Sequence, residues 1–135
     1  MPSLSSRAAA VVLAAGLTVA SAGLAAADHG GGGGGSDVRR EGHCSGAAHW
    51  KLKVKPDDGR LEVEIEVDSN RNGQTWTWRI LHDGYVSYRG SRVTRAPSGS
   101  FSVERRVVDM AGSDLIGFRA KNAATGQTCR GHLTY

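Results

Sequence analysis

From Ala47 onward, apolar and polar residues alternate in short runs that are separated by turn-forming residues. A repeat of two is typical of half-buried antiparallel strands, whereas an amphipathic helix repeats its apolar positions every three to four residues. The pattern predicts seven strands, which begin near Ala47, Arg60, Thr75, Tyr85, Gly99, Leu115 and Gln127. Seven short strands in a chain of this size favour an all-β, two-layer antiparallel β-sandwich.

The first two strands are predicted to form a hairpin around the turn Pro56-Asp57-Asp58-Gly59, which pairs Lys55 with Arg60. A proline early and a glycine late in a turn suit the backbone angles that such a loop requires. Counting outward, the apolar residues of both strands share one face and lysines oppose glutamates on the other. The predicted pairs are Val54/Leu61, Leu52/Val63, Trp50/Ile65, Ala48/Val67, Lys53/Glu62, Lys51/Glu64 and His49/Glu66. A slip of one residue would reverse both faces, so turn and pattern agree.

A second hairpin is predicted around Asp83-Gly84, for which two registers compete. The dipeptide is a strong signal for a two-residue turn. That register opposes apolar residues with Arg89 and Ser87, however, and a three-residue loop, His82-Asp83-Gly84, avoids this. The longer loop opposes Ile80 with Val86 and Trp78 with Tyr88. We therefore predict the three-residue form, with Gly84 at the position of positive φ.

The last hairpin is predicted to turn through residues 123–126 and to pair Asn122 with Gln127. This register places Cys129 opposite Ala120, on the core side of the strand. Cys44, the only other cysteine, lies just ahead of the first strand. We predict a Cys44–Cys129 disulfide, which closes a loop of about 85 residues and contributes roughly 4 to 5 kcal/mol in the chain-entropy model.

The fifth run, residues 99–109, departs from the simple pattern. Its alternation would turn Arg105 inward beside Phe101, Val103 and Val107. A β-bulge near Arg105, or an edge position for the strand, would relieve this conflict. The sequence leaves both alternatives open.

Residues 118–126 resemble the sixth strand and following turn of fibronectin type III modules, where an alternating strand ends in Ala-x-Asn before a glycine turn. Together with the strand count, the resemblance implies an immunoglobulin- or fibronectin type III-like sandwich. The predicted disulfide departs from the immunoglobulin pattern, in which the bond joins the second and sixth strands.

The N-terminus has the features of a secretory signal peptide. Arg7 precedes an apolar run over residues 8–26, and small residues, Ala25-Ala26-Ala27, end it. We predict cleavage after Ala27, with Ala20-Ser21-Ala22 as a second possible site and a membrane anchor as the alternative. The whole chain is also similar to small, one-disulfide secreted proteins of high-GC Gram-positive bacteria, a likeness that implies secretion and no particular chemistry. The predicted organisation is a signal peptide (1–27), a flexible Gly-rich tail (28–42) and a β-sandwich domain (43–135), with no stable membrane insertion after the leader is removed.

The composition excludes few functions and favours none strongly. Removal of Arg7 with the leader lowers the formal net charge by one from +4, an excess too small to indicate specific nucleic-acid binding. No nucleophile with a base, no pair of acids in a cleft and no cofactor motif emerges from the sequence. Glu62, Glu64 and Glu66 lie at strand spacing beside lysines and are predicted to form a solvated face. His43, Cys44 and His49 suggest a metal site only if Cys44 is not in the disulfide, so we predict no metal, cofactor or catalytic residue.

The most distinctive feature is a predicted cationic surface. If the third, fourth, sixth and seventh predicted strands share one sheet, its outward positions carry basic residues that almost no acid faces. These are Arg79, Arg89, Arg119, Lys121, Arg130 and His132. Such a face attracts polyanions, so we predict a non-enzymatic binding or structural module that contacts an anionic wall polymer or an extracellular protein. The alternative is that these arginines only keep the protein soluble.

Two other functions remain as alternatives. Residues 92–99 form a loop with Arg95-Ala96-Pro97 that could inhibit an extracellular protease, and a hydrolase is the less favoured alternative. An inhibitor would remove protease activity stoichiometrically, and a hydrolase would need a pocket with converging polar groups.

Overall fold

The computed structural model describes residues 36–135, so the predicted signal peptide and the glycine run Gly30–Gly35 lie outside the described residues. The described chain forms eight β-strands and contains no helix long and apolar enough to cross a membrane. The strands are β1 (Val38–His43), β2 (His49–Asp57), β3 (Arg60–Asp68), β4 (Thr75–His82), β5 (Tyr85–Val93), β6 (Ser100–Val108), β7 (Leu115–Asn122) and β8 (Thr128–Thr134).

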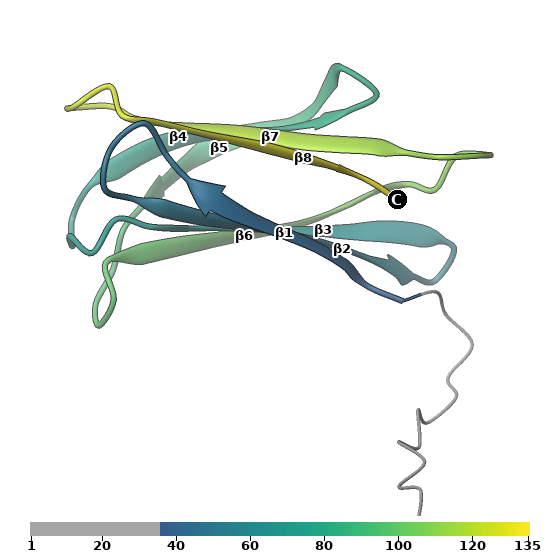
Figure 1. The fold of residues 1–135 in the computed structure, drawn as a ribbon, viewed down its shortest axis with the longest axis horizontal. Helices are drawn as coiled ribbons and strands as arrows, with labels where there is room; N and C mark the ends of the chain where they lie inside the picture. The colour runs from purple at the N-terminus through teal and green to yellow at the C-terminus, as the bar shows by residue number, and fades with distance from the viewer. Residues whose placement is uncertain (1–35) are drawn as a thin grey trace, which may run out of the picture. The chain divides into compact units, whose positions relative to one another are not determined.

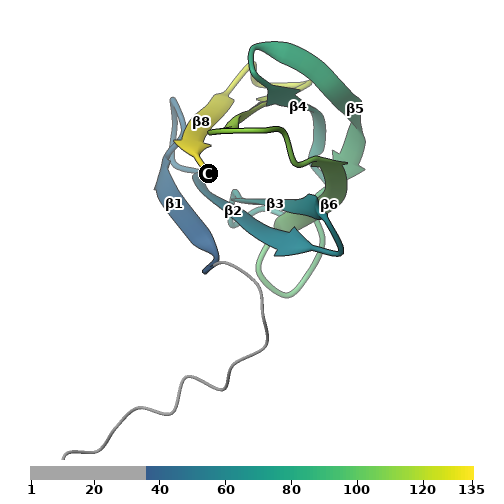
Figure 2. The same ribbon diagram turned by 90° about the vertical axis from the view of Figure 1, so that its right-hand side faces the viewer.

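The strands form two antiparallel sheets that face each other as layers (Figure 1). One sheet has the order β1-β2-β3-β6, and the other has the order β5-β4-β7-β8. Figure 2, a view along the strands, shows the two sheets enclosing a common interior. The predicted all-β sandwich is confirmed, and the seven predicted strands correspond to β2 through β8.

The interior is filled by the residues that alternation assigned to it. Trp76 and Trp78 of β4 and Trp50 of β2 are buried, and the Trp50 ring meets the Phe118 ring edge-on with centroids 5.3 Å apart. The exception is Val86, which we predicted on the core side and which is 44% exposed.

Strand β1 was not predicted, because residues 38–42 were assigned to the flexible tail. In the structure this segment pairs with β2 from Val38↔Val54 to His43↔His49. Its sequence, Val-Arg-Arg-Glu-Gly-His, has a single strongly apolar residue, so it carries no period-two signal. The strand forms because β2 offers unpaired backbone groups along its edge, which almost any non-proline sequence can satisfy.

The first hairpin has a tighter turn than predicted. Only Asp58 and Gly59 lie between the paired residues Asp57 and Arg60, and both turn residues have positive φ, +48° and +73°. Two-residue turns of this kind match the natural twist of the strands better than a four-residue loop. The register therefore moves by two residues, for example Val54↔Val63, and the shift keeps the apolar face and the Lys/Glu face intact.

The second hairpin also uses two turn residues, Asp83 and Gly84, so the predicted three-residue loop is wrong. Both residues again have positive φ. The register then shifts at a bulge, because Leu81 pairs with Val86 whereas Ile80 pairs with Tyr88. The bulge brings Tyr88 opposite Ile80, which neither simple register achieves.

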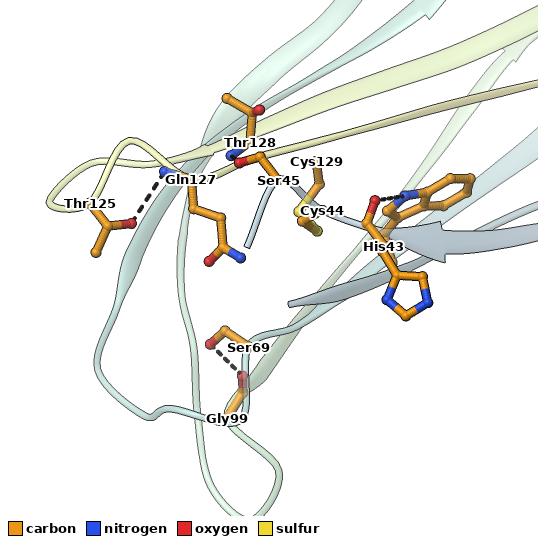
Figure 3. The surroundings of a disulfide bond; sticks show 10 residues. His43, Cys44, Ser45, Ser69, Gly99, Thr125, Gln127, Thr128 and Cys129 are labelled. Carbon is orange, nitrogen blue, oxygen red and sulfur yellow. Dashed lines mark hydrogen bonds between the residues drawn. A yellow bond between two sulfur atoms is a disulfide. The ribbon is translucent and has the colours of Figure 1, made fainter. Parts of the chain in front are cut away.

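The last hairpin and the disulfide agree with the prediction. Ala120 pairs with Cys129, and Cys44 and Cys129 are bonded across a sequence separation of 85 residues. Figure 3 shows Gln127 beside this bond, reaching toward the loop that joins β1 to β2. With its amide oxygen oriented toward that loop, Gln127 accepts hydrogen bonds at 2.9 to 3.0 Å from three consecutive backbone N–H groups, those of residues 46–48. The N–H of Ser45 donates to the carbonyl of Thr128 at 2.8 Å, and the N–H of Thr128 donates to the Ser45 hydroxyl at 2.9 Å; these two bonds fasten the same loop to β8.

Strand β6 resolves the two alternatives for Arg105. Its pairing with β3 runs without a register shift, so there is no bulge, and β6 is the edge strand of its sheet. The guanidinium of Arg105 lies at the open side of the sandwich, 5.3 Å from the Trp78 ring centre and 5.9 Å from that of Tyr88. The hydroxyl of Tyr88 donates to the carbonyl of Arg106 at 2.8 Å, which joins the edges of the two sheets.

We expect the disulfide to supply a large part of the stability. Replacing Cys44 and Cys129 together by Ser should lower the free energy of unfolding by roughly 4 to 5 kcal/mol, because the bond closes a long loop in the unfolded chain. Urea unfolding of the variant and of the oxidised protein measures this. A loss below about 1 kcal/mol would contradict the chain-entropy account.

Candidate functional site

Four arginines stand in register across the outer face of the sheet β5-β4-β7-β8. Arg79 on β4 pairs directly with Arg89 on β5 and with Arg119 on β7, and Arg119 pairs with Arg130 on β8. All four are exposed, because the intervening positions on these strands turn inward. We call these four residues the arginine row. Since neighbouring strands lie about 4.7 to 4.9 Å apart, the row extends for roughly 14 Å across the sheet.

The next row toward the disulfide is rich in hydroxyl groups. Ser91, Thr77, Lys121 and Thr128 pair in that order across the same four strands. The Thr77 hydroxyl donates to the carbonyl of Lys121 at 3.5 Å. We call the arginine row together with Lys121 the cationic face.

The cationic face lines an open depression of about 1090 Å³. His43 and Ser45, from the end of β1 and the loop after it, form part of its lining beside the disulfide. The depression is therefore bounded by the loop that the Cys44–Cys129 bond holds in place. Because residues of all four strands line it, the depression suits an extended ligand that crosses the sheet.

No acid lies on this face among the described residues. The outward positions of the four strands carry no Asp or Glu, and none of the ion pairs in the described chain includes a member of the cationic face.

The other sheet has the opposite character. Its outer face pairs lysines with glutamates across β2 and β3, and these pairs are Lys51–Glu66, Lys53–Glu64 and Lys55–Glu62. The hydrogen bond from Lys55 to Glu62 raises the pKa of the Lys55 ammonium. Positive charge is thus neutralised on one face of the sandwich and left unopposed on the other, as the sequence pattern predicts.

His132, the sixth predicted face residue, lies one row beyond the arginine row on the same outer face. It is exposed on β8 opposite Gly117 and lines a second depression, whose lining also includes Leu81, Leu115, Arg119 and Arg130. Leu81 and its partner Val86 are outward-facing, so this end of the sheet is apolar. Sequence analysis missed the apolar end because it assigned Val86 to the core.

The remaining candidates are placed as follows. The rings of His43 and His49 face each other with centroids 4.5 Å apart, while Cys44 is in the disulfide. Glu62 and Glu64 are engaged by lysines, and Glu62 is buried beneath Lys55, so the prediction of a solvated face is wrong for that residue. The loop with Arg95 is exposed, but its backbone closes on itself, because the N–H of Arg95 donates to the carbonyl of Ser100 at 3.0 Å.

Comparison with protein-family models, with curated proteins and with solved structures found no match for this chain. A function has to be argued from the residues and their geometry, and the cationic face is the arrangement that offers the clearest chemistry.

The arginine row should cost stability in the free protein. Like charges that stand directly opposite each other on a sheet repel, by roughly 0.2 to 1 kcal/mol for each pair. We expect Arg119→Gln to raise the free energy of unfolding at low salt by about that amount, since Arg119 has an arginine on each side. The gain should shrink as salt screens the charges.

Urea unfolding at low and high salt tests this expectation. Lys51→Gln on the other sheet is the matched control and should lower stability, because Lys51 has an acid on each side, Glu41 on β1 and Glu66 on β3. Destabilisation by Arg119→Gln at both salt concentrations would show that the row is not repulsive.

Proposed function

We propose that the protein is a secreted, non-enzymatic binding module whose cationic face holds an extended polyanion, such as an anionic cell-wall polymer. The observation that carries the proposal is the arginine row, four guanidinium-bearing residues in direct register with no acid on the same face.

Arginine suits this role for chemical reasons. Its planar guanidinium can donate two parallel hydrogen bonds to a phosphate or carboxylate group, and it stays charged at any ordinary pH. A linear polymer that lies across the strands meets the guanidinium groups of Arg89, Arg79, Arg119 and Arg130 in succession. Lys121 and the hydroxyls of the next row extend the contact surface on one side.

The repulsion within the row supports function over mere solubility. A soluble surface is obtained more cheaply with mixed charges, as the other sheet shows with its lysine–glutamate pairs. Like charges that stand side by side destabilise a sheet, and residues that lower local stability in this way are expected at functional sites. A bound polyanion would neutralise the four arginines and remove their mutual repulsion. The removal of this repulsion would then make the free energy of binding more favourable.

An extracellular location fits the chemistry. A disulfide persists in an oxidising compartment, and the Cys44–Cys129 bond with the signal-peptide features of residues 1–27 supports export. The four-strand sheet β5-β4-β7-β8 also supports the immunoglobulin- or fibronectin type III-like plan.

The other candidates have less support. An acidic extracellular protein would use the same face and is distinguished by the experiment below. An inhibitor loop has to present extended backbone to a protease, whereas the backbone at Arg95 folds back onto Ser100. A hydrolase would need a nucleophile joined to a base in one pocket. His43 and Ser45 both line the depression on the cationic face, but the Ser45 hydroxyl accepts the N–H of Thr128 and no hydrogen bond joins it to His43 in the described chain.

The test is retention on an immobilised polyanion. The protein should bind columns of wall teichoic acid and of polyphosphate and should elute as salt rises. The triple variant Arg79→Gln, Arg119→Gln, Arg130→Gln should lose retention at salt concentrations where the unmodified protein binds.

The control variant Arg39→Gln, Lys51→Gln, Arg60→Gln removes the same number of positive charges from exposed positions on the other sheet. It should keep most of the retention. Equal loss in both variants would mean that net charge alone matters, and retention by an acidic protein column without retention by either polymer would point to a protein partner; either result rejects the proposal.

A further inference from the structure

A second group of ligand-type side chains lies where β4 turns into β5 and where the chain enters β7. His82 is the last residue of β4, Asp83 is the first residue of the turn, and Asp114 immediately precedes β7. One nitrogen or oxygen atom from each of the three side chains lies within 4.8 Å of the other two. None of these residues belongs to the cationic face.

The backbone holds the two acids in place. The N–H of Asp83 donates to the carbonyl of Leu115 at 2.9 Å, and the N–H of Leu115 donates back to Oδ1 of Asp83 at 3.0 Å. Asp114 exchanges two backbone hydrogen bonds with Tyr135, at 3.0 and 2.9 Å. These bonds leave Oδ2 of Asp83 directed at the imidazole of His82, 3.5 Å from its Nε2 atom.

Asp114 is the most buried acid of the described chain, with a side chain that is 1% exposed. Its Oδ1 contacts Nε2 of His82 and accepts the N–H of Met110 at 3.3 Å. Its Oδ2 is also buried and has no hydrogen-bond partner among the described residues. A buried carboxylate oxygen without a donor or a cation is costly, so Oδ2 leaves this carboxylate able to take a further positive partner besides His82.

We propose that His82, Asp83 and Asp114 bind one divalent transition-metal ion, represented by Zn²⁺, with water completing the coordination. Tetrahedral zinc with bonds of about 2.0 to 2.1 Å places its ligand atoms roughly 3.3 to 3.4 Å apart. The 3.5 Å separation between His82 and Asp83 is close to this value. Asp114 Oδ1 contacts the same Nε2 atom, so binding of the ion requires these two atoms to move apart to the separation of zinc ligands.

The donor set favours a transition metal over calcium or magnesium. An imidazole nitrogen and carboxylate oxygens are all donor types that zinc binds, whereas Ca²⁺ and Mg²⁺ prefer six or more oxygen ligands. The carboxylate of Asp83 is 42% exposed, which gives the ion a path from solvent, while His82 and Asp114 shield the inner side.

The ion would join two strands of the cationic face. Residue His82 ends β4 and Asp114 leads into β7, and these central strands carry Arg79 and Arg119. We therefore assign the site a structural role, in which metal binding stabilises the end of the sandwich. The proposal is independent of what the cationic face binds.

The experiment uses Zn²⁺ alone, added to the protein after treatment with a chelator. Equilibrium dialysis should find one Zn²⁺ per chain at this site, and Zn²⁺ should raise the melting temperature because it binds only the folded state. Asp83→Asn should weaken Zn²⁺ binding at least tenfold. The stability of the metal-free variant should stay nearly unchanged, because Asn keeps the oxygen that accepts from Leu115.

The double variant His43→Gln, His49→Gln is the control, because it removes an adjacent pair of imidazole rings outside the proposed site. It should bind Zn²⁺ as the unmodified protein does. Undiminished binding by Asp83→Asn, loss of binding in the His43/His49 variant, tighter binding of Ca²⁺ than of Zn²⁺, or no stoichiometric binding would each overturn the proposal.

Discussion

Burial of the inner face of β4 is the constraint on which the rest of the structure depends. Trp76, Trp78 and Ile80 are all buried between the two sheets. Because side chains alternate along a strand, their burial forces Arg79 outward. β4 pairs with both β5 and β7, so its orientation also fixes which residues of those strands face solvent. Alternate residues of the same strands therefore form the core on one side of the sheet and the cationic face on the other.

The relative magnitudes explain why the arginine row persists. Burying one large apolar side chain contributes roughly 1.5 to 3 kcal/mol, whereas a like-charge pair on a sheet costs about 0.2 to 1 kcal/mol. The inner face of β4 alone holds three large buried side chains, which outweigh the three arginine pairs of the row. Burial of the core thus keeps the arginine row in place even though its charges repel one another. The row remains exposed and available to an anionic ligand.

The sequence determines which residues face the core more reliably than it determines which residues pair. Seven strands, their buried faces and the Cys44–Cys129 bond followed from alternation and turn chemistry. The register of the first hairpin could not be predicted in this way, because a shift of two residues leaves the apolar face and the charged face unchanged. β1 carries no alternation, and the bulge in the β4–β5 hairpin accompanies a contact of Tyr88 with Arg106 of the opposite sheet, which lies outside the reach of a local pattern. The His82–Asp114 contact joins residues 32 positions apart through sheet topology, which no local pattern reveals.

The arrangement of charge also explains why composition understates the cationic face. The whole chain has a formal net charge of +4, which alone indicates no strong field. The lysines of β2 are opposed by glutamates of β3, so that sheet contributes little to the long-range potential. The excess charge is then concentrated on one face, where a depression bounded by protein of low dielectric strengthens its effect on a nearby anion. A modest net charge is therefore compatible with a strong local preference for polyanions, because the lysines of one sheet are neutralised by glutamates while the arginines of the other sheet are not.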